Sequence, residues 1–179
     1  MSNGFVRRVV TGFDEAGNST IVEDGKSPHI KSVPERPGYY STNIWRSGAA
    51  PVSVAEPDQI SGHIGVSPPA NGTVLRVIEF PPEPQDLEEK TRQIKATFGE
   101  IFQDADQSHS QELHPGMHQT DTVDYAIVLE GEIVAMMEKA ETILKTGDIL
   151  VQRGTNHAWS NRSEHPCKVA FILIDGQRN

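Results

Sequence analysis

The chain has 179 residues, a formal net charge of −9 and 36% hydrophobic residues, which suits one domain with a moderate core. The acidic balance argues against nucleic acid and anionic membranes as partners, and no apolar run approaches the roughly 20 residues that span a bilayer. Fifteen glycines and twelve prolines indicate many turns, as in an all-β domain with long loops. The single cysteine, Cys167, cannot form an intrachain disulfide, so we expect a cytoplasmic protein.

Residues 1–84 predict short strands joined by irregular connections. The segments "RRVVTG" and "STIVED" flank the turn "FDEAGN", a pattern typical of a hairpin. Two further strands are predicted at "YYSTNIW" and "TVLRVIEF". We expect this segment to be an extension that packs on the core domain or on a partner, because exposed edge strands need cover.

Residues 85–110 predict one short amphipathic helix followed by a polar loop. Within 85–102, apolar or small side chains recur at three- and four-residue spacing, at Leu87, Thr91, Ile94, Phe98 and Ile101. Two positions for this helix remain open. It packs on the outside of a sheet, or it forms a lid over the mouth of a barrel.

Residues 111–179 predict the core domain. Short strand-like segments are separated by "EGE", "EKAE", "KTGD", "QRGTNH" and "NRSEHPC", so that a turn follows every 8–12 residues. This spacing is typical of an antiparallel sandwich or barrel. Cys167 opens the last apolar run and is interpreted as a small strand residue.

The segment "HPGMHQTDTVDYAIVLEGE" (114–132) carries the first group of candidate site residues. Because side chains alternate along a strand, one face should carry His118, Thr120, Thr122 and Asp124. The other face carries the bulky residues Val123, Tyr125, Ile127 and Leu129, so we expect both faces to be covered. A buried, unpaired Asp124 would be costly, and it therefore needs a hydrogen-bond partner or a cation.

The segment "GDILVQRGTNHAWSN" (147–161) carries the second group. By the same alternation, His157, Trp159 and Asn161 share a face. His118, Asp124 and His157 together predict a metal site with two histidines and one carboxylate, a set that leaves coordination positions open. The alternative is that these side chains only hydrogen-bond one another.

These two segments resemble the motifs of the small single-barrel cupins of the "cupin 2" type. Gly131, Asp124 and His118 match the closing glycine, the glutamate position and the first histidine of the first motif. Gly147, Gly154, His157 and Asn161 match the second motif. Thr120 stands where the second histidine is expected, and aspartate replaces glutamate. The resemblance implies a cupin barrel, that is, a double-stranded β-helix or jelly roll, and it fixes the reaction poorly.

Further side chains are candidates for direct roles in such a barrel. His114, Thr120 and Trp159 are candidate catalytic residues, although His114 could also be a loop histidine and Trp159 a core residue. Arg46, Arg76 and Asn161 are candidate substrate-binding residues. Arg76 could instead form a salt bridge, and Asn161 could tie a strand end by hydrogen bonding.

The resemblance favours a metal-dependent enzyme with Fe, Mn, Ni or Zn, acting on a small keto, enol, carboxylate or phenolic molecule. With iron we expect a non-haem oxygenase-type oxidoreductase. With other metals, a lyase or isomerase is the alternative. A non-catalytic binding cupin is the second alternative, because one motif histidine is missing. The resemblance also implies a homodimer.

Overall fold

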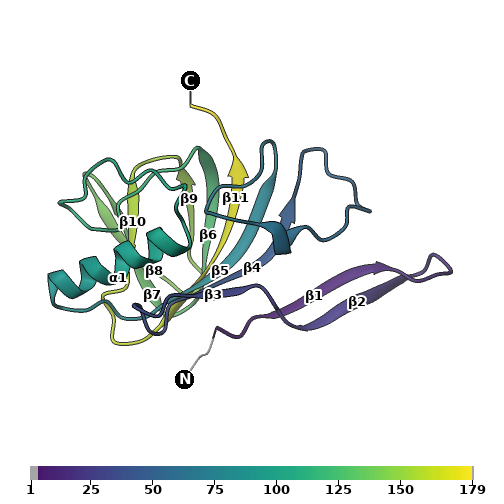
Figure 1. Ribbon diagram of the computed structural model, residues 1–179, viewed down its shortest axis with the longest axis horizontal. Helices are drawn as coiled ribbons and strands as arrows, with labels where there is room; N and C mark the ends of the chain where they lie inside the picture. Colours follow the sequence, from purple (N-terminus) through teal and green to yellow (C-terminus); the bar gives the residue numbers. More distant parts are fainter. Residues whose placement is uncertain (1–3, 179) are drawn as a thin grey trace.

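The computed structural model describes residues 4–178 and contains two antiparallel sheets that enclose a common core (Figure 1). The larger sheet has the strand order β3 (Ile30–Ser32), β4 (Tyr40–Ser47), β5 (Thr73–Phe80), β11 (Cys167–Asp175), β6 (Thr122–Glu130) and β9 (Ile149–Arg153). The smaller sheet has the order β10 (His157–Ser160), β7 (Glu132–Met137) and β8 (Glu141–Lys145). This arrangement confirms the predicted all-β cupin fold with one helix.

The segment 1–84 contributes directly to the larger sheet. β4 pairs with β5, and β5 pairs with β11 at the centre of the sheet. The register places Arg76 of β5 opposite Phe171 of β11, with both side chains buried. The N-terminal half therefore supplies part of the wall around the core.

Burial along β6 follows the predicted alternation. Thr122, Asp124, Ala126 and Val128 are buried and face the interior. The following Gly131 has a φ of +78°, and a Cβ atom there would lie 2.8 Å from the carbonyl oxygen of Pro166. Glycine is therefore required at the turn between β6 and β7, and this turn sets the register of the hairpin.

The sequence predicted one continuous strand for the polar row that begins at His118. The structure shows that this row is interrupted. β6 begins only at Thr122, and His118 instead forms an isolated bridge with His157. β6 pairs with β9 only up to Val123 and Arg153, after which Gly154 turns the chain with a φ of +60°. The bend brings the two histidine-bearing segments together beyond the end of the sheet.

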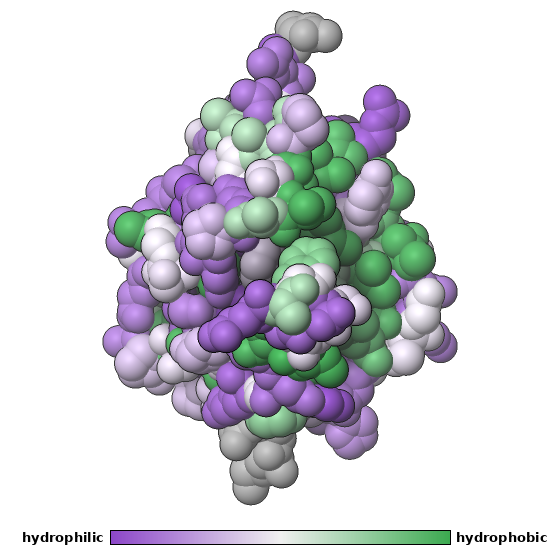
Figure 2. Space-filling model, turned by 90° about the vertical axis from the view of Figure 1, so that its right-hand side faces the viewer, coloured by the Kyte–Doolittle hydropathy of each residue, from purple (hydrophilic) through white to green (hydrophobic). Residues whose placement is uncertain are grey.

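The outer face of β6 is exposed, which corrects the expectation that both faces are covered. Val123 and Tyr125 are 37% and 41% exposed, and Ile149 and Val151 of the neighbouring β9 are 63% and 54% exposed. These four residues form what we call the outer apolar face. Apolar surface of this kind gathers along one side of the molecule (Figure 2).

The helix α1 (Leu87–Glu100) lies within the predicted range 85–102. It begins at Asp86, whose side chain accepts a hydrogen bond from the backbone N–H of Glu89 at 2.8 Å. Ile94 and Thr97 are buried and line the interior cavity together with Phe98. The helix therefore closes one wall of the cavity, as the lid alternative required.

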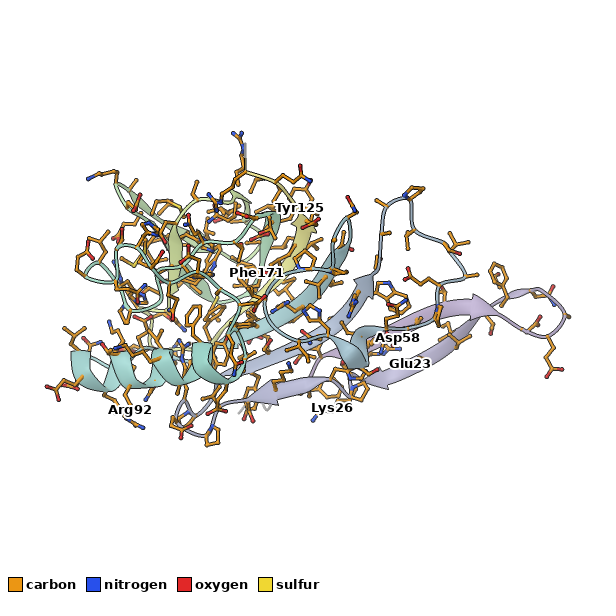
Figure 3. All side chains as sticks on the ribbon, turned by 45° about the horizontal axis from the view of Figure 1, so that its top comes forward. Glu23, Lys26, Asp58, Arg92, Tyr125 and Phe171 are labelled. Carbon is orange, nitrogen blue, oxygen red and sulfur yellow. The ribbon has the colours of Figure 1, made fainter. Side chains whose placement is uncertain are left out.

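The hairpin of β1 (Arg7–Phe13) and β2 (Ser19–Lys26) confirms the predicted pairing and extends away from the two sheets (Figure 1). At its base, buried Arg8 forms ion pairs with Glu23 and with Asp58, both of which lie on this side of the molecule (Figure 3). A short 3₁₀ turn, η1 (Ile60–Gly62), follows Asp58. Within residues 4–178, no helix has the length and apolar character needed to cross a membrane.

Candidate functional site

The candidate site is an internal cavity of about 70 Å³ between the two sheets and α1. This volume is several times the roughly 10–15 Å³ that one water molecule needs, so it can hold a small ligand. Its apolar lining consists largely of Val66, Ile78, Phe80, Ile94, Phe98, Phe102, Trp159, Phe171 and Leu173. Its polar lining consists of Arg36, Tyr39, Arg76, Thr97, His114, His118, Thr120, Asp124 and His157.

His118 and His157 lie side by side in this cavity, with ring centroids 4.4 Å apart. The Nδ1–H of His118 donates to the carbonyl oxygen of Gly116 at 2.8 Å, and that of His157 donates to the carbonyl oxygen of Thr155 at 3.0 Å. A carbonyl only accepts, so each ring must carry its proton on Nδ1. Each Nε2 is therefore left with a free lone pair, as in metal-binding histidines.

Burial favours the neutral form of both imidazoles. It lowers the pKa of His118, and it lowers the pKa of His157 well below the ordinary value, with a further contribution from His118. Neutral imidazole is the form that binds metals. The pair therefore offers two nitrogen donors to the cavity at neutral pH.

Asp124 lines the same cavity and is 4% exposed. Burial raises the pKa of its carboxyl to about 6. A hydrogen bond from Thr122 and the charge of Arg76 lower the pKa but do not outweigh burial. The Oδ1 atom has no hydrogen-bond partner among the described residues. This unpartnered oxygen and the two free Nε2 atoms are donors of the types that divalent transition metals bind.

The predicted three-residue set is not assembled as the structure stands. Among residues 4–178, no group of three or more His, Cys, Asp or Glu side chains is arranged to hold a metal ion. His118 and His157 are paired, whereas the carboxylate of Asp124 takes its hydrogen bond from Thr122. Aspartate is one methylene shorter than the glutamate of the cupin motif, which keeps its carboxylate close to its own strand.

Thr120 and Trp159 both line the cavity, where the sequence placed candidate catalytic side chains. The Thr120 hydroxyl is within 2.7 Å of the Thr122 hydroxyl. The indole of Trp159 makes edge contacts with His157 and Phe171, at centroid distances of 5.7 and 5.1 Å. Trp159 thus supports one histidine of the pair and forms part of the aromatic wall.

Arg76 is the buried cation of the cavity, at 1% exposure. Its guanidinium donates to the carbonyl oxygens of Gly65 and Val66 at 3.2 and 2.8 Å and to His63 Nε2 at 3.0 Å. Its Nε has no hydrogen-bond partner among the described residues, and the charges of Asp104 and Asp124 act on the guanidinium. Carbonyl groups and His63 thus supply the hydrogen bonds of Arg76, where a salt bridge was the alternative expected from the sequence.

The cavity lining also contains Arg36 and Tyr39, which sequence reasoning missed. The guanidinium of Arg36 lies 4.5 Å from the ring centroid of Tyr39, and both residues are buried and line the cavity. Burial raises the pKa of Tyr39 to about 12, so its phenol stays protonated. Arg36 comes from the irregular segment "SVPERPG", which has no strand or helix period that could have placed it, and Tyr39 stands at the start of the predicted strand "YYSTNIW".

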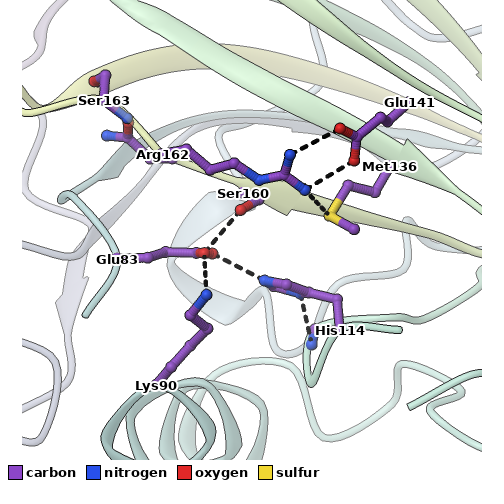
Figure 4. Close-up of polar contacts among 10 residues, drawn as sticks. Glu83, Lys90, His114, Met136, Glu141, Ser160, Arg162 and Ser163 are labelled. Carbon is purple, nitrogen blue, oxygen red and sulfur yellow. Dashed lines mark hydrogen bonds and ion pairs between the residues drawn. The ribbon is translucent and has the colours of Figure 1, made fainter. Parts of the chain in front are cut away.

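His114 is buried, which excludes the surface-loop alternative. Its Nε2–H donates to Glu83 at 3.0 Å, and its Nδ1 accepts from the backbone N–H of Gly116 at 3.1 Å (Figure 4). Both ring nitrogens are thus engaged within the protein, so His114 offers no lone pair to a metal here. Glu83, which sequence reasoning also missed, further accepts from Ser160 and pairs with Lys90.

Two candidate substrate-binding residues do not reach the cavity. The amide of Asn161 donates to the carbonyl oxygens of Phe80 and His165 and accepts from Ser163, which satisfies the side chain. Asn161 therefore ties the end of β10, and its assignment to substrate binding is corrected. Arg46 lies on β4 and is not among the residues that line the cavity, although its charge acts on His63, the partner of Arg76.

Comparison with known proteins identifies relatives in fungi. The chain is 51% identical over 72 residues to phomopsin biosynthesis cluster protein C' of Diaporthe leptostromiformis, an alignment that covers 37% of this chain and 38% of that protein. It is 24% identical over 181 residues to the cupin-domain-containing oxidoreductase fogC of Aspergillus ruber, covering 95% of this chain and 72% of that protein. The first relative is thus matched over little more than a third of its length.

Among solved structures, the fold is similar to a cupin superfamily protein of Desulfitobacterium hafniense, with a TM-score of 0.42 and 11% identity over 78% of this chain and 80% of that chain. Residues 106–174 match the Cupin_2 family, described as a cupin domain. This stretch contains the paired histidines, Asp124 and the closing Gly131. Residues 106–174 therefore match a cupin domain.

Proposed function

We propose that this protein is a metal-dependent cupin enzyme of the oxidoreductase type that acts on a small polar organic molecule. One observation carries the proposal. His118 and His157 each use Nδ1–H to bind a backbone carbonyl, which leaves two neutral Nε2 donors side by side in a buried cavity. The relatives named as cupin-domain-containing oxidoreductases support the reaction class.

Asp124 completes the donor set in this proposal. Its unpartnered Oδ1 is buried in the same cavity, where a cation would compensate the cost of desolvating the carboxylate. A bound Fe(II) would supply one-electron and dioxygen chemistry, and Mn, Ni or Zn would supply Lewis acidity. The protein itself contributes the fixed histidine tautomers and a cavity with aromatic walls.

The other lining residues support a proposed substrate class. Arg76 and Arg36 provide positive charge, and Tyr39 stays protonated and can donate a hydrogen bond. The aromatic rings of Phe98, Trp159 and others offer flat apolar walls. These features favour a small enol, keto acid or phenol, in which an acidic oxygen lies close to an unsaturated or aromatic group.

A non-catalytic binding cupin is the second candidate. The observation that favours it is the absence of an assembled three-residue metal group among residues 4–178, together with Thr120 at the position of the second motif histidine. Such a protein would use the same cavity and the same arginines to hold a ligand without converting it. A lyase or isomerase remains the alternative reaction class if the bound metal is redox-inert.

The decisive experiment combines metal analysis with turnover. Purified protein is reconstituted without oxygen with Fe(II), Mn(II), Ni(II) or Zn(II), desalted, and analysed for bound metal. It is then mixed with a panel of enols, 2-keto acids and phenols while oxygen consumption and products are recorded. We expect close to one equivalent of metal and oxygen uptake with the iron form. Less than one tenth of an equivalent of every metal would rule out the enzyme proposal and leave the binding protein.

A further inference from the structure

Glu83 is a buried carboxylate outside the donor set, in the loop "PPEP" between β5 and α1. Its carboxylate accepts from Ser160 Oγ at 2.7 Å and from His114 Nε2 at 3.0 Å, and Lys90 Nζ of α1 lies 3.2 Å away (Figure 4). Its backbone N–H donates to the carbonyl oxygen of Asn161 at 2.9 Å. Glu83 is thus fixed by the helix, by β10 and by the loop that carries His114.

Burying a charged carboxylate costs free energy, so the contacts of Glu83 must compensate for this cost. Burial alone would raise the pKa of Glu83, but the hydrogen bonds from His114 and Ser160 and the charge of Lys90 outweigh it and lower the pKa. Glu83 is therefore a charged acceptor with a fixed position. A fixed charged acceptor is well suited to orient the imidazole that donates to it.

From His114 the contacts continue to the histidine pair. His114 Nδ1 accepts from the backbone N–H of Gly116, and the carbonyl oxygen of the same Gly116 accepts from His118 Nδ1–H. With Nε2–H directed at Glu83, the Nδ1 of His114 carries no proton and can accept from the Gly116 N–H. The N–H and the carbonyl group of Gly116 thus connect His114 to His118 through the backbone of one residue.

The packing at Gly116 shows that this connection is tight. A Cβ atom on Gly116 would lie 3.1 Å from Nδ1 and 3.3 Å from Cε1 of His114. The neighbouring Met117 is fully buried, and its N–H donates to the carbonyl oxygen of His114 at 3.0 Å. The loop 114–118 therefore has little room to adopt another conformation while His114 stays in place.

We propose that Glu83 and His114 are positioning residues that hold His118, through the Gly116 peptide, in the Nδ1–H tautomer with Nε2 free. His157 is the internal control, because its Nδ1–H donates to the carbonyl oxygen of Thr155 and not to the Gly116 backbone that connects to His114 and Glu83. The inference rests on the proposed function for its purpose, since a free Nε2 on His118 is what a metal ion would bind. The tautomer itself can be measured without any metal.

The first test is ¹⁵N–¹H NMR of the histidine rings in the metal-free Glu83→Ala variant. We expect His118 to lose its single Nδ1–H tautomer, while His157 stays as in the wild type. Glu83→Gln should remain close to the wild type, because the amide oxygen still accepts from His114. Lys90→Met is the matched control. It removes the ion pair but leaves the His114 contact, so the His118 signals should not change.

The second test is the dissociation constant for Zn(II), measured by calorimetry. Loss of an outer hydrogen bond to a metal ligand typically weakens binding about 10- to 100-fold, and we expect this loss for Glu83→Ala but not for Lys90→Met. If Glu83→Ala does not fold, His114→Phe breaks the same connection one step later and should have the same effect on His118.

A folded Glu83→Ala or His114→Phe variant with unchanged His118 signals would overturn the inference. Equal changes at His118 and His157 would also overturn it, because they would indicate general loosening of the cavity. Failure of the wild type to bind any metal would defeat the proposed function alone. The tautomer measurement would then still decide the role of Glu83 and His114.

Discussion

His118 and His157 are joined by their backbones as well as by their rings. The N–H of each residue donates to the carbonyl oxygen of the other at 2.9 Å, and the ring centroids lie 4.4 Å apart. This bridge joins the backbone of a loop before β6 to the start of β10 and holds the two imidazoles next to each other. A rigid donor pair of this kind is what a buried metal site requires.

Replacing one histidine of the pair should abolish metal binding. We expect His118→Ala and His157→Ala to bind less than a tenth as much Zn(II) or Fe(II) as the wild type, because each variant removes one of two neutral nitrogen donors. His165→Ala is the control, since His165 is exposed and does not line the cavity. Atomic emission analysis after reconstitution measures the metal. Unchanged metal content in either cavity variant would show that these histidines are not ligands.

Replacing Asp124 by asparagine should have opposite effects on the metal-free and the metal-bound protein. Burial raises the pKa of Asp124 from 3.8 to about 6, which at 1.36 kcal/mol per unit corresponds to about 3 kcal/mol of destabilisation at neutral pH. We therefore expect Asp124→Asn to raise the free energy of unfolding of the metal-free protein by up to about 3 kcal/mol, and to weaken Zn(II) binding.

Urea denaturation and calorimetry measure these two effects. Asp121→Asn is the control, because it removes a carboxylate from the exposed surface and leaves the cavity unchanged. The prediction for Asp124 is wrong if Asp124→Asn binds Zn(II) as tightly as the wild type. In that case the carboxylate does not belong to the donor set.

His63 should make the protein sensitive to mild acid. Its Nε2 must accept from Arg76, because a guanidinium only donates, so His63 has to be neutral. Burial and the charge of Arg76 lower the pKa of His63 from 6.5 to about 4. The unfolded chain therefore binds this proton at a higher pH than the folded chain, and stability that is complete above pH 6.5 is lost as the pH falls towards 4.

A His63→Gln variant isolates this contribution. Glutamine can still accept from Arg76 but does not titrate. Between pH 7 and pH 4, the loss in free energy of unfolding should therefore be up to about 3 kcal/mol smaller in the variant than in the wild type. Urea denaturation at pH 7 and at pH 4 provides the comparison. Equal losses in the two proteins would mean that His63 contributes nothing to the pH dependence.

The outer apolar face is where we expect the homodimer contact that the cupin resemblance implies. Tyr125 and Val151 pair across β6 and β9 and remain 41% and 54% exposed, beside Val123 and Ile149. A lysine at Tyr125 should separate the copies, because it would place a charge in an apolar contact. Val54→Lys is the matched control, since Val54 is 95% exposed and lies in a loop outside this face.

Light scattering after size-exclusion chromatography measures the effect. The expected outcome is a dimer for the wild type and Val54→Lys and a monomer for Tyr125→Lys. A dimer in all three proteins would show that the contact does not involve the outer apolar face. A monomeric wild type would show that the dimer prediction is wrong.

Much of the cavity could be predicted from local sequence patterns. The alternation along 122–128 correctly put Thr122 and Asp124 on the inner face, because a strand has only two faces. The motif spacing brought His118 and His157 to the same end of the sheet pair, where the structure joins them. The three- and four-residue spacing in 85–102 predicted α1 within two residues at each end. Neighbours in sequence determine the strand alternation and the helix spacing, whereas the common site of the two histidines was expected in part from the cupin resemblance.

The residues that sequence reasoning missed are those fixed by distant contacts. Glu83 contacts Ser160, which is 77 positions away, and His114, which is 31 positions away. Arg36 reaches Thr97 of α1 from 61 positions away. Neither residue lies in a segment with a helix or strand period, so nothing local indicated that its side chain is buried. The exposure of Tyr125 was mispredicted for the same reason, since cover on a strand depends on what other elements pack there.

By itself, the sequence determined the class of fold, the strand register around Gly131 and the choice of two histidines and an aspartate as candidate ligands. Backbone geometry and side-chain chemistry act over a few residues and leave a readable pattern. Only the tertiary structure decided that the two histidines are paired, that Asp124 stands apart from them, and that Glu83 and His114 connect to His118. These relations depend on contacts between elements that are distant in the sequence, and such contacts form only when the chain folds.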